Sequence, residues 1–231
     1  MINSINRLIN FVPEKEMDKD KIDKKDHILD VAERMFSDLG YDGASTRMIS
    51  GEAGVNMAML NYYFGSKEGL FLAVFERKIY SFQTLLQNIG NDENMTSWDK
   101  LAMCIDKYVD KIIVNNCFQK LIHMEMYMSK RGELSDKITE ILMVNVREIG
   151  KILDEGVKTG DFLKDIDVQL VIASIFGTKN YIVNTPNISS LILGHDIRDE
   201  KFLEEKLKPR IKTYMKRLLK AYLMNDNDYK K

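Results

Sequence analysis

Apolar residues recur at intervals of three and four through most of the chain, and this period predicts helices throughout. The first predicted helix runs from Lys24 to Leu39 and ends at Gly40. Its apolar face consists of Ile28, Leu29, Val31, Ala32, Met35, Phe36 and Leu39. Residues 1–22 show no sustained period, and we interpret them as a flexible N-terminal arm.

Two short helices are predicted on either side of Gly54. Ser45 or Thr46 is expected to cap the first helix, and glycine at position 54 can enter the left-handed backbone conformation that ends it. Asn56 can cap the second, whose apolar stripe is Leu60, Tyr63 and Phe64. This layout is that of a helix-turn-helix, whose second helix enters the major groove of DNA. Helical proteins that do not bind DNA also contain such pairs, so the spacing alone leaves both interpretations open.

The rest of the chain is also predicted to be helical, over residues 67–88, 98–114, 118–128, 136–158, 168–183 and 201–224. Ser66, Ser135 and Asp167 stand where N-terminal caps are expected. Pro186 is expected to stop one helix before a loop, and Pro209 should kink or divide the last one. The pattern gives about nine helices in total.

The predicted fold is therefore all-α, with a three-helix N-terminal helix-turn-helix domain and a larger helical domain. The expected divisions are the arm at 1–22, a DNA-binding domain at 23–70, an effector-binding and dimerisation domain at 71–225, and a tail at 226–231. A helix over 67–88 is long enough to belong to both domains.

Composition narrows the class of protein without identifying it. The 231 residues carry a net charge of −1, which does not favour a nucleic-acid binder. Within 23–70, eight acids outnumber the bases Lys24, Lys25, Arg34, Arg47 and Lys67. Any DNA contact must therefore come from a local patch, from hydroxyl groups and from helix N-termini. The arm at 1–22 is either a frayed terminus or a lysine-bearing segment that touches the DNA backbone.

Two cysteines are too few for a disulfide framework, and no apolar run reaches the length of a membrane span. We therefore expect a cytoplasmic protein that does not enter a membrane. Cys104 and Cys117 are interpreted as buried thiols, with oxidant sensing as the alternative.

The segment Tyr62–Leu70 reads Tyr-Tyr-Phe-Gly-Ser-Lys-Glu-x-Leu and closely resembles the signature of the TetR family of bacterial transcription regulators. Upstream positions that also fit that family's pattern are Ala32, Phe36, Gly40, Tyr41, Ser45, Thr46 and Ile49. The resemblance is specific over residues 23–71 and follows the family's overall plan beyond them.

The resemblance implies a transcriptional regulator, most simply a repressor, that binds double-stranded operator DNA as a homodimer. The DNA-binding residues expected from it are Thr46, Arg47, Asn56, Met57, Ala58, Met59, Asn61, Tyr62, Tyr63 and Lys67. Asn61 can make a bidentate contact with adenine, while methionine and alanine offer only apolar contact, for instance to a thymine methyl group. The two tyrosines and Lys67 are expected at phosphates, with a solvated charge as the alternative for the lysine. Arg47 is expected at a phosphate or paired with an acid.

The family plan also implies an unidentified small-molecule effector bound by the second domain. Candidate pocket residues are Tyr108, Ile112, Phe118, His123, Met124, Met126, Tyr127 and Phe176, for which ordinary core packing is the alternative. Candidate dimer residues are Ile172, Ile175, Phe176, Leu203, Leu207, Ile211, Met215 and Leu218, on the last two predicted helices. Burial within a single subunit is the alternative for these residues.

No sequence motif points to catalysis, and the three histidines lack the spacing of a metal site. We therefore expect neither an enzyme nor a bound cofactor or metal. Two other classes stay open at this point: a helical adaptor whose helix-turn-helix is architectural, and a small helical enzyme.

Overall fold

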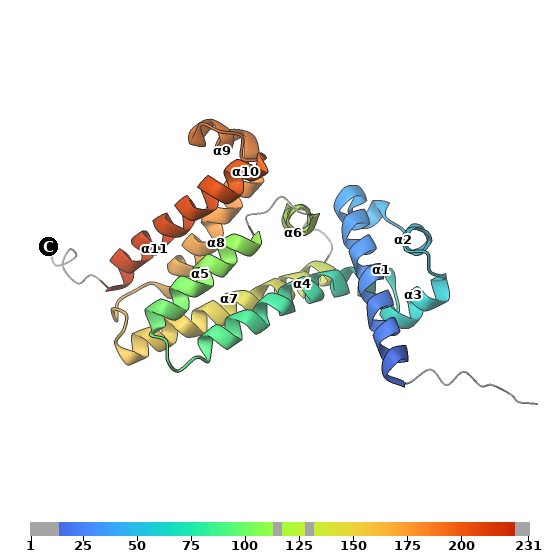
Figure 1. Cartoon of the computed structure of the whole chain (residues 1–231), viewed down its shortest axis with the longest axis horizontal. Coiled ribbons are helices and arrows are strands. Elements are labelled where there is room, and N and C mark those ends of the chain that lie inside the picture. The colour runs from blue at the N-terminus through green and yellow to red at the C-terminus, as the bar shows by residue number, and fades with distance from the viewer. Residues whose placement is uncertain (1–13, 113–116, 128–131, 225–231) are drawn as a thin grey trace, which may run out of the picture. The chain divides into compact units, whose positions relative to one another are not determined.

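The computed structural model describes residues 14–112, 117–127 and 132–224, without the side chains of residues 14–22, 112, 126, 127, 179 and 180 (Figure 1). These residues form helices and no strand, so the all-α prediction is confirmed. The chain divides into two compact units between Val74 and Phe75. Among the described helices, none is sufficiently long and apolar to cross a membrane.

The first unit contains α1 (Glu14–Gly43), α2 (Thr46–Glu52), α3 (Met57–Phe64) and the start of α4 (Lys67–Gly90). Its fully buried side chains include Ile28, Ala32, Phe36, Ile49, Leu60, Leu70 and Phe71. The phenyl ring of Phe36 packs edge-on against that of Phe71, with the ring centroids 4.7 Å apart. This small core ties α1 to α4 and leaves the outer faces of α2 and α3 exposed.

The first helix begins about ten residues before its predicted start at Lys24. Residues 14–22, expected within a flexible arm, are helical, while residues 1–13 lie outside the described chain. The segment has many good helix formers and no glycine, but it lacks the apolar period on which the prediction relied. Gly40 does break the helix as predicted, with φ 73° and ψ 170°.

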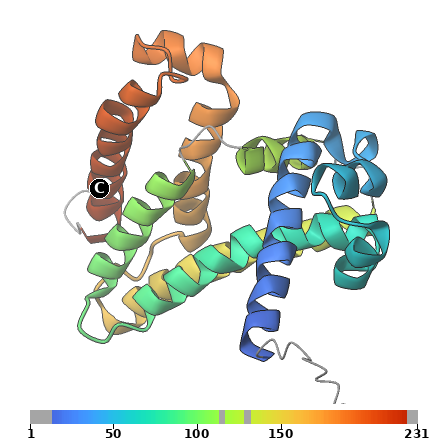
Figure 2. The same ribbon diagram turned by 45° about the vertical axis from the view of Figure 1, so that its right-hand side comes forward.

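The second unit contains the rest of α4 and all the later helices (Figure 2). These are α5 (Ser97–Ile112), α6 (Cys117–Tyr127), α7 (Glu133–Thr159), α8 (Val168–Asn184), α9 (Pro186–Leu193), α10 (Glu200–Phe202), a π-helical turn (Leu203–Leu207) and α11 (Lys208–Met224). The core lies between α4, α5, α7, α8 and α11, and it includes Leu86, Leu101, Ile105, Ile152, Leu153 and Leu223. The single tryptophan, Trp98, packs against this core.

Polar contacts fix how the helices of this unit pack. Glu148 on α7 is buried, and its Oε1 accepts hydrogen bonds from Gln83 Nε2 at 3.1 Å and Gln87 Nε2 at 3.0 Å. The two glutamines lie one turn apart on α4, so they hold α4 in one register against α7. Lys151 Nζ also contacts Glu148, at 3.1 Å. A second set of ion pairs joins α11 to α5: Lys212 to Asp110 at 2.6 Å, and Lys216 to Asp106 at 2.9 Å.

Three predictions about the ends of helices in this unit have different outcomes. Asp167 caps α8 as expected, with its Oδ1 accepting from Leu170 N at 2.9 Å. Ser135 does not cap α7, which begins two residues earlier, after Gly132. Pro186 ends α8 but also opens α9 inside the predicted loop, because proline suits the first position of a helix.

Candidate DNA-binding surface and effector region

The path from α2 to α3 is set by capping side chains and one glycine. Ser45 caps α2 by accepting from Met48 N at 3.2 Å, and Asn56 caps α3 by accepting from Met59 N at 2.7 Å. Between the two helices Gly54 has φ +64°, a conformation that glycine adopts without steric cost. The predicted helix-turn-helix is therefore present, with its turn at Gly54 and with Ser45 and Asn56 as the caps of its two helices.

One side chain of α3 is fully buried, and its position identifies which face of the helix points toward the core. Leu60 lies in the core, and Tyr63 and Phe64 next to it are half-buried. Of the predicted DNA-binding residues, the exposed ones are Arg47, Asn56, Met57, Ala58, Asn61 and Tyr62, and the half-buried ones are Thr46, Met59, Tyr63 and Lys67. The side chain of Tyr62 is 78% exposed. The expected outer face of α3 is thus largely open to solvent.

Lys67 lies at the start of α4 but reaches back to the end of α1. Its Nζ lies 4.5 Å from the centroid of the Tyr41 ring and 3.5 Å from the backbone oxygen of Asp42. These contacts hold the ammonium group in place and leave N–H donors available, because an ammonium group carries three. A phosphate contact therefore stays a prediction for this residue.

Arginines on neighbouring helices differ in their partners. Arg34 on α1 pairs with Glu52 at the end of α2, with 2.6 Å between Nη2 and Oε1. Arg47 in the first turn of α2 is exposed and forms no ion pair with an acid among the described residues. Of the two roles expected for Arg47, the internal ion pair is therefore not observed. Its guanidinium group is left available for an external anion.

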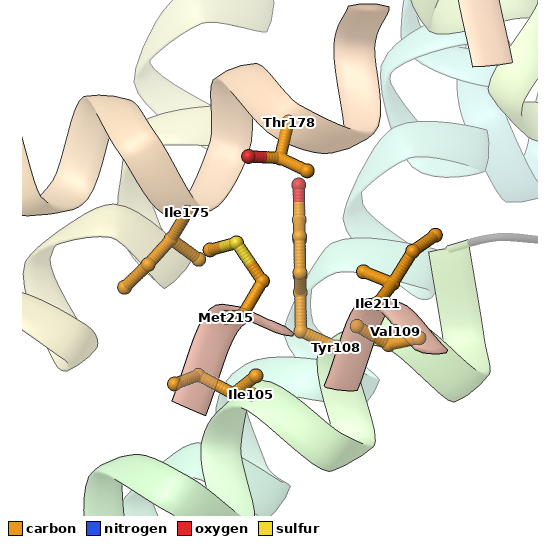
Figure 3. A pocket seen from close by; sticks show the side chains of 7 residues that line it. All are labelled: Ile105, Tyr108, Val109, Ile175, Thr178, Ile211 and Met215. Atoms are coloured by element: carbon orange, nitrogen blue, oxygen red, sulfur yellow. The ribbon is translucent and has the colours of Figure 1, made fainter. Parts of the chain in front are cut away.

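In the second unit, a cavity of about 10 Å³ lies between α5, α8 and α11, where a cluster of apolar side chains surrounds Tyr108 and Thr178 (Figure 3). The Tyr108 ring stands in the middle with its hydroxyl end toward Thr178. The ring of Phe176 also packs against it, with the two ring centroids 4.9 Å apart. Burial raises the pKa of Tyr108, so its hydroxyl stays protonated. The space is about that of one water molecule, so this cavity admits no larger ligand in the described structure.

The structure brings together only some of the predicted pocket residues. Tyr108 and Phe176 are in contact, whereas Phe118 packs on Phe75 of α4, with 5.4 Å between ring centroids. His123 and Met124 are half-buried on α6. The side chains of Ile112, Met126 and Tyr127 lie outside the described residues. The further cavity residues Ile105, Val109, Ile175, Thr178, Ile211 and Met215 were not predicted as pocket residues, and their apolar spacing in the sequence resembles that of any core position.

Five of the predicted dimer residues, Ile175, Leu203, Leu207, Ile211 and Met215, are buried within their own unit, which agrees with the alternative interpretation for them. Ile172 and Phe176 pack partly against the same core, and Leu218 is exposed. An apolar stripe has the same period whether it faces its own core or a partner, so the sequence does not separate the two interpretations. The large apolar side chains that remain exposed on α8, α9 and α11 are Leu170, Tyr181, Ile188, Leu191, Ile192, Tyr214, Leu218, Tyr222 and Met224.

The two cysteines differ in accessibility. Cys104 is fully buried on α5, and burial raises the pKa of its thiol to about 12. A thiol in that environment stays protonated and unreactive at neutral pH. Cys117 at the start of α6 is half-buried and is not in a disulfide.

Comparison with known proteins gives matches along most of the chain. A family described as "Bacterial regulatory proteins, tetR family" matches residues 28–74, and one described as "YsiA-like protein, C-terminal region" matches residues 75–191. The fatty acid metabolism regulator protein of Bacillus subtilis is 30% identical over 72% of this chain and 85% of its own length. The transcriptional repressor NicS of Pseudomonas putida is 45% identical over 77% of this chain and 84% of its own length.

Solved structures share this fold. The regulator FadR from Bacillus subtilis, in complex with stearoyl-CoA, superposes with a TM-score of 0.62 and 25% identity. That match covers 82% of this chain and 96% of the solved one.

Proposed function

Because this chain belongs to the TetR family of bacterial transcriptional regulators, we propose that it represses transcription by binding operator DNA as a homodimer and that a small molecule releases it. In this proposal residues 23–70 bind DNA, and residues 71–225 bind the effector and form the dimer. The observation that carries the proposal is the outer face of α3, a capped helix whose residues Met57, Ala58, Asn61 and Tyr62 are exposed.

The outer face of α3 has the chemistry of a recognition helix. Asn61 can read adenine through its side-chain amide, and Tyr62 and Tyr63 can donate their hydroxyl groups to phosphates. The unpaired guanidinium of Arg47 lies in the first turn of α2, where backbone N–H groups also point outward. These groups form a local anion-binding patch, which the net charge of the chain does not reveal.

Two-fold symmetry supplies the affinity that one α3 helix lacks, since a dimer presents two such helices about 34–36 Å apart to successive major grooves. The exposed apolar side chains of α8, α9 and α11 support dimerisation through these helices. Leu218→Glu should shift the dimer toward monomer in sedimentation velocity, because its side chain is 45% exposed on α11. Leu39→Glu on α1, with a residue 47% exposed, is the matched control and should leave the dimer intact.

For the effector, the stearoyl-CoA complex of the B. subtilis regulator favours an acyl thioester as the first compound to test. The cavity beside Tyr108 is far too small for an acyl chain, so a ligand there must bind a more open state of the unit. The open state would be the one with lower operator affinity, because a ligand acts only through its preference for one state over another. Helix α4, which contributes residues to both units, is the covalent element through which this change passes.

The test is a fluorescence-anisotropy titration against DNA from upstream of the protein's own gene and against an unrelated duplex, at two salt concentrations. A regulator should bind the upstream DNA about a thousandfold more tightly and lose affinity steeply with salt. Stearoyl-CoA should then release the complex, with free coenzyme A as the control. If refolded, ligand-free protein binds neither duplex and also selects nothing from a random-sequence pool, the proposal is wrong.

A further inference from the structure

The base-reading face of α3 carries no charge. Residues 55–66 contain no acidic, basic or histidine side chain. Its exposed residues Met57, Ala58, Asn61 and Tyr62 lie within an arc of about 140°, at about 100° per residue. Guanine is most often read by arginine or lysine, which bind its O6 and N7 together. This arc has no such group, so it lacks the commonest means of selecting a G·C pair.

What the arc offers is apolar contact, the side-chain amide of Asn61 and the hydroxyl group of Tyr62, which the proposed function assigns to a phosphate. Met57 is 36% exposed, and its Sδ lies 3.3 Å from Ser50 Oγ on α2. The Ser50 hydroxyl has one proton and a stronger acceptor in the backbone oxygen of Arg47, at 3.0 Å, so its approach to the sulfur is a packing contact. That contact packs the Met57 thioether against α2, while the residue as a whole stays exposed. Ala58, the next residue, presents a single methyl group.

In the major groove the apolar group on a base edge is the 5-methyl group of thymine. We propose that the base pairs facing α3 in each half-site are A·T pairs, with thymine methyl groups packed against Met57 and Ala58 and an adenine held by Asn61. The inference rests on the proposed DNA-binding function and specifies which DNA the protein selects. Arg47, on α2, lies outside this arc and is free to contact a phosphate or a flanking base.

The test begins with selection of a tight-binding duplex from a random pool by the full-length protein. Each thymine of that duplex is then replaced by deoxyuridine, which removes the methyl group and keeps every hydrogen-bonding group. Removing one packed methyl should weaken binding about fourfold, from the free energy of burying one such group. The same change in both half-sites of a symmetric operator should weaken binding by about the square of that factor, roughly 15-fold.

Substitution of Met57 tests whether this residue causes the loss of affinity on deoxyuridine replacement. Met57→Ala should reduce the deoxyuridine effect at one thymine per half-site to less than about 1.5-fold, because the packing surface is then absent. Met143→Ala on α7, also at a residue 36% exposed, is the matched control and should keep the full effect. Thermal unfolding of each variant checks that the fold is retained.

Two results would overturn the inference while leaving the proposed function intact: a selected duplex with G·C pairs at the centre of each half-site, or deoxyuridine replacement without effect at every thymine. Failure to select any duplex would instead refute the proposed function itself. A thymine-dependent effect that persists in Met57→Ala and in Ala58→Gly would also refute the assignment to these two side chains.

Discussion

Glu148 offers the sharpest test of how the second unit is held together. Replacing it with alanine leaves the amide groups of Gln83 and Gln87 without their acceptor on α7. Each of these hydrogen bonds should contribute about 1–1.5 kcal/mol, since the acceptor is charged but the donors are only half-buried. The ion pair to Lys151 adds little, because the lysine side chain is largely exposed. We therefore expect Glu148→Ala to lower the free energy of unfolding by about 2–3 kcal/mol.

The effect should also depend on pH. Burial raises the pKa of Glu148, but the hydrogen bonds from Gln87, Gln83 and Lys151 outweigh it and hold the pKa below its ordinary value of 4.5. A carboxyl group with a lowered folded-state pKa stabilises the fold above its unfolded-state pKa and loses that contribution as the pH falls through the folded-state value. The difference in free energy of unfolding between the natural protein and Glu148→Gln should therefore be largest at pH 7 and should decrease below about pH 4.5.

Trp98 makes the measurement specific to this unit, because it is the only tryptophan and packs against the unit's core. Urea titrations followed by its fluorescence at pH 7 and pH 4 give the free energies of unfolding. Glu140→Ala is the matched control on the same helix, since Glu140 forms an exposed pair with Arg147 and should contribute less than about 1 kcal/mol. Equal losses for Glu148→Ala and Glu140→Ala, or a gap that does not change with pH, would refute the reasoning.

Three further substitutions test the site and the packing. Asn61→Ala should remove about 1–3 kcal/mol of preference for the selected duplex over an unrelated one, and an unchanged preference in anisotropy titrations would mean that bases are read elsewhere. Lys67→Ala should weaken binding to both duplexes by the same factor, and it should lower the slope of log affinity against log salt concentration by about one. A loss of affinity confined to the selected duplex would argue against a phosphate contact. Gly156→Ala should destabilise the second unit by about 1–3 kcal/mol, because a Cβ there would lie 2.2 Å from the buried Phe162 ring. Gly150→Ala on the same helix meets only an ordinary contact at 3.7 Å, and a loss equal to that of Gly156→Ala would show that the clash is not the cause.

Sequence reasoning succeeded where structure depends on a few adjacent residues. The turn at Gly54, the cap Asn56 and the cap Asp167 depend on local backbone conformation and hydrogen bonding, and the structure has all three as predicted. It failed for the start of α1, where a charged helix has no apolar period to detect. The start of α9 is also unexpected from the sequence, because a proline suits both the end of one helix and the first position of the next.

The effector region and the dimer face could not be derived in the same way. Tyr108 and Phe176 meet only once α5 and α8 pack together, and no local pattern encodes that contact. Met215 and Leu218 lie on the same helix within one turn, yet the first is buried and the second exposed. Their position around the helix relative to α5 and α8 decides the difference, and that depends on tertiary packing.

The uncharged stretch at residues 55–66 separates two kinds of contact that many DNA-binding helices combine. In the proposed complex the cations that displace counterions from DNA, such as Arg47 and Lys67, lie on α2 and α4 and can contact any duplex. Raising the ionic strength should therefore weaken operator and non-operator complexes by similar factors and leave their ratio nearly constant. Under osmotic stress such a repressor would dissociate from operator and non-operator DNA alike, and it would not move from its operators to random sites. Its choice of operator would then be insensitive to the salt content of the cell.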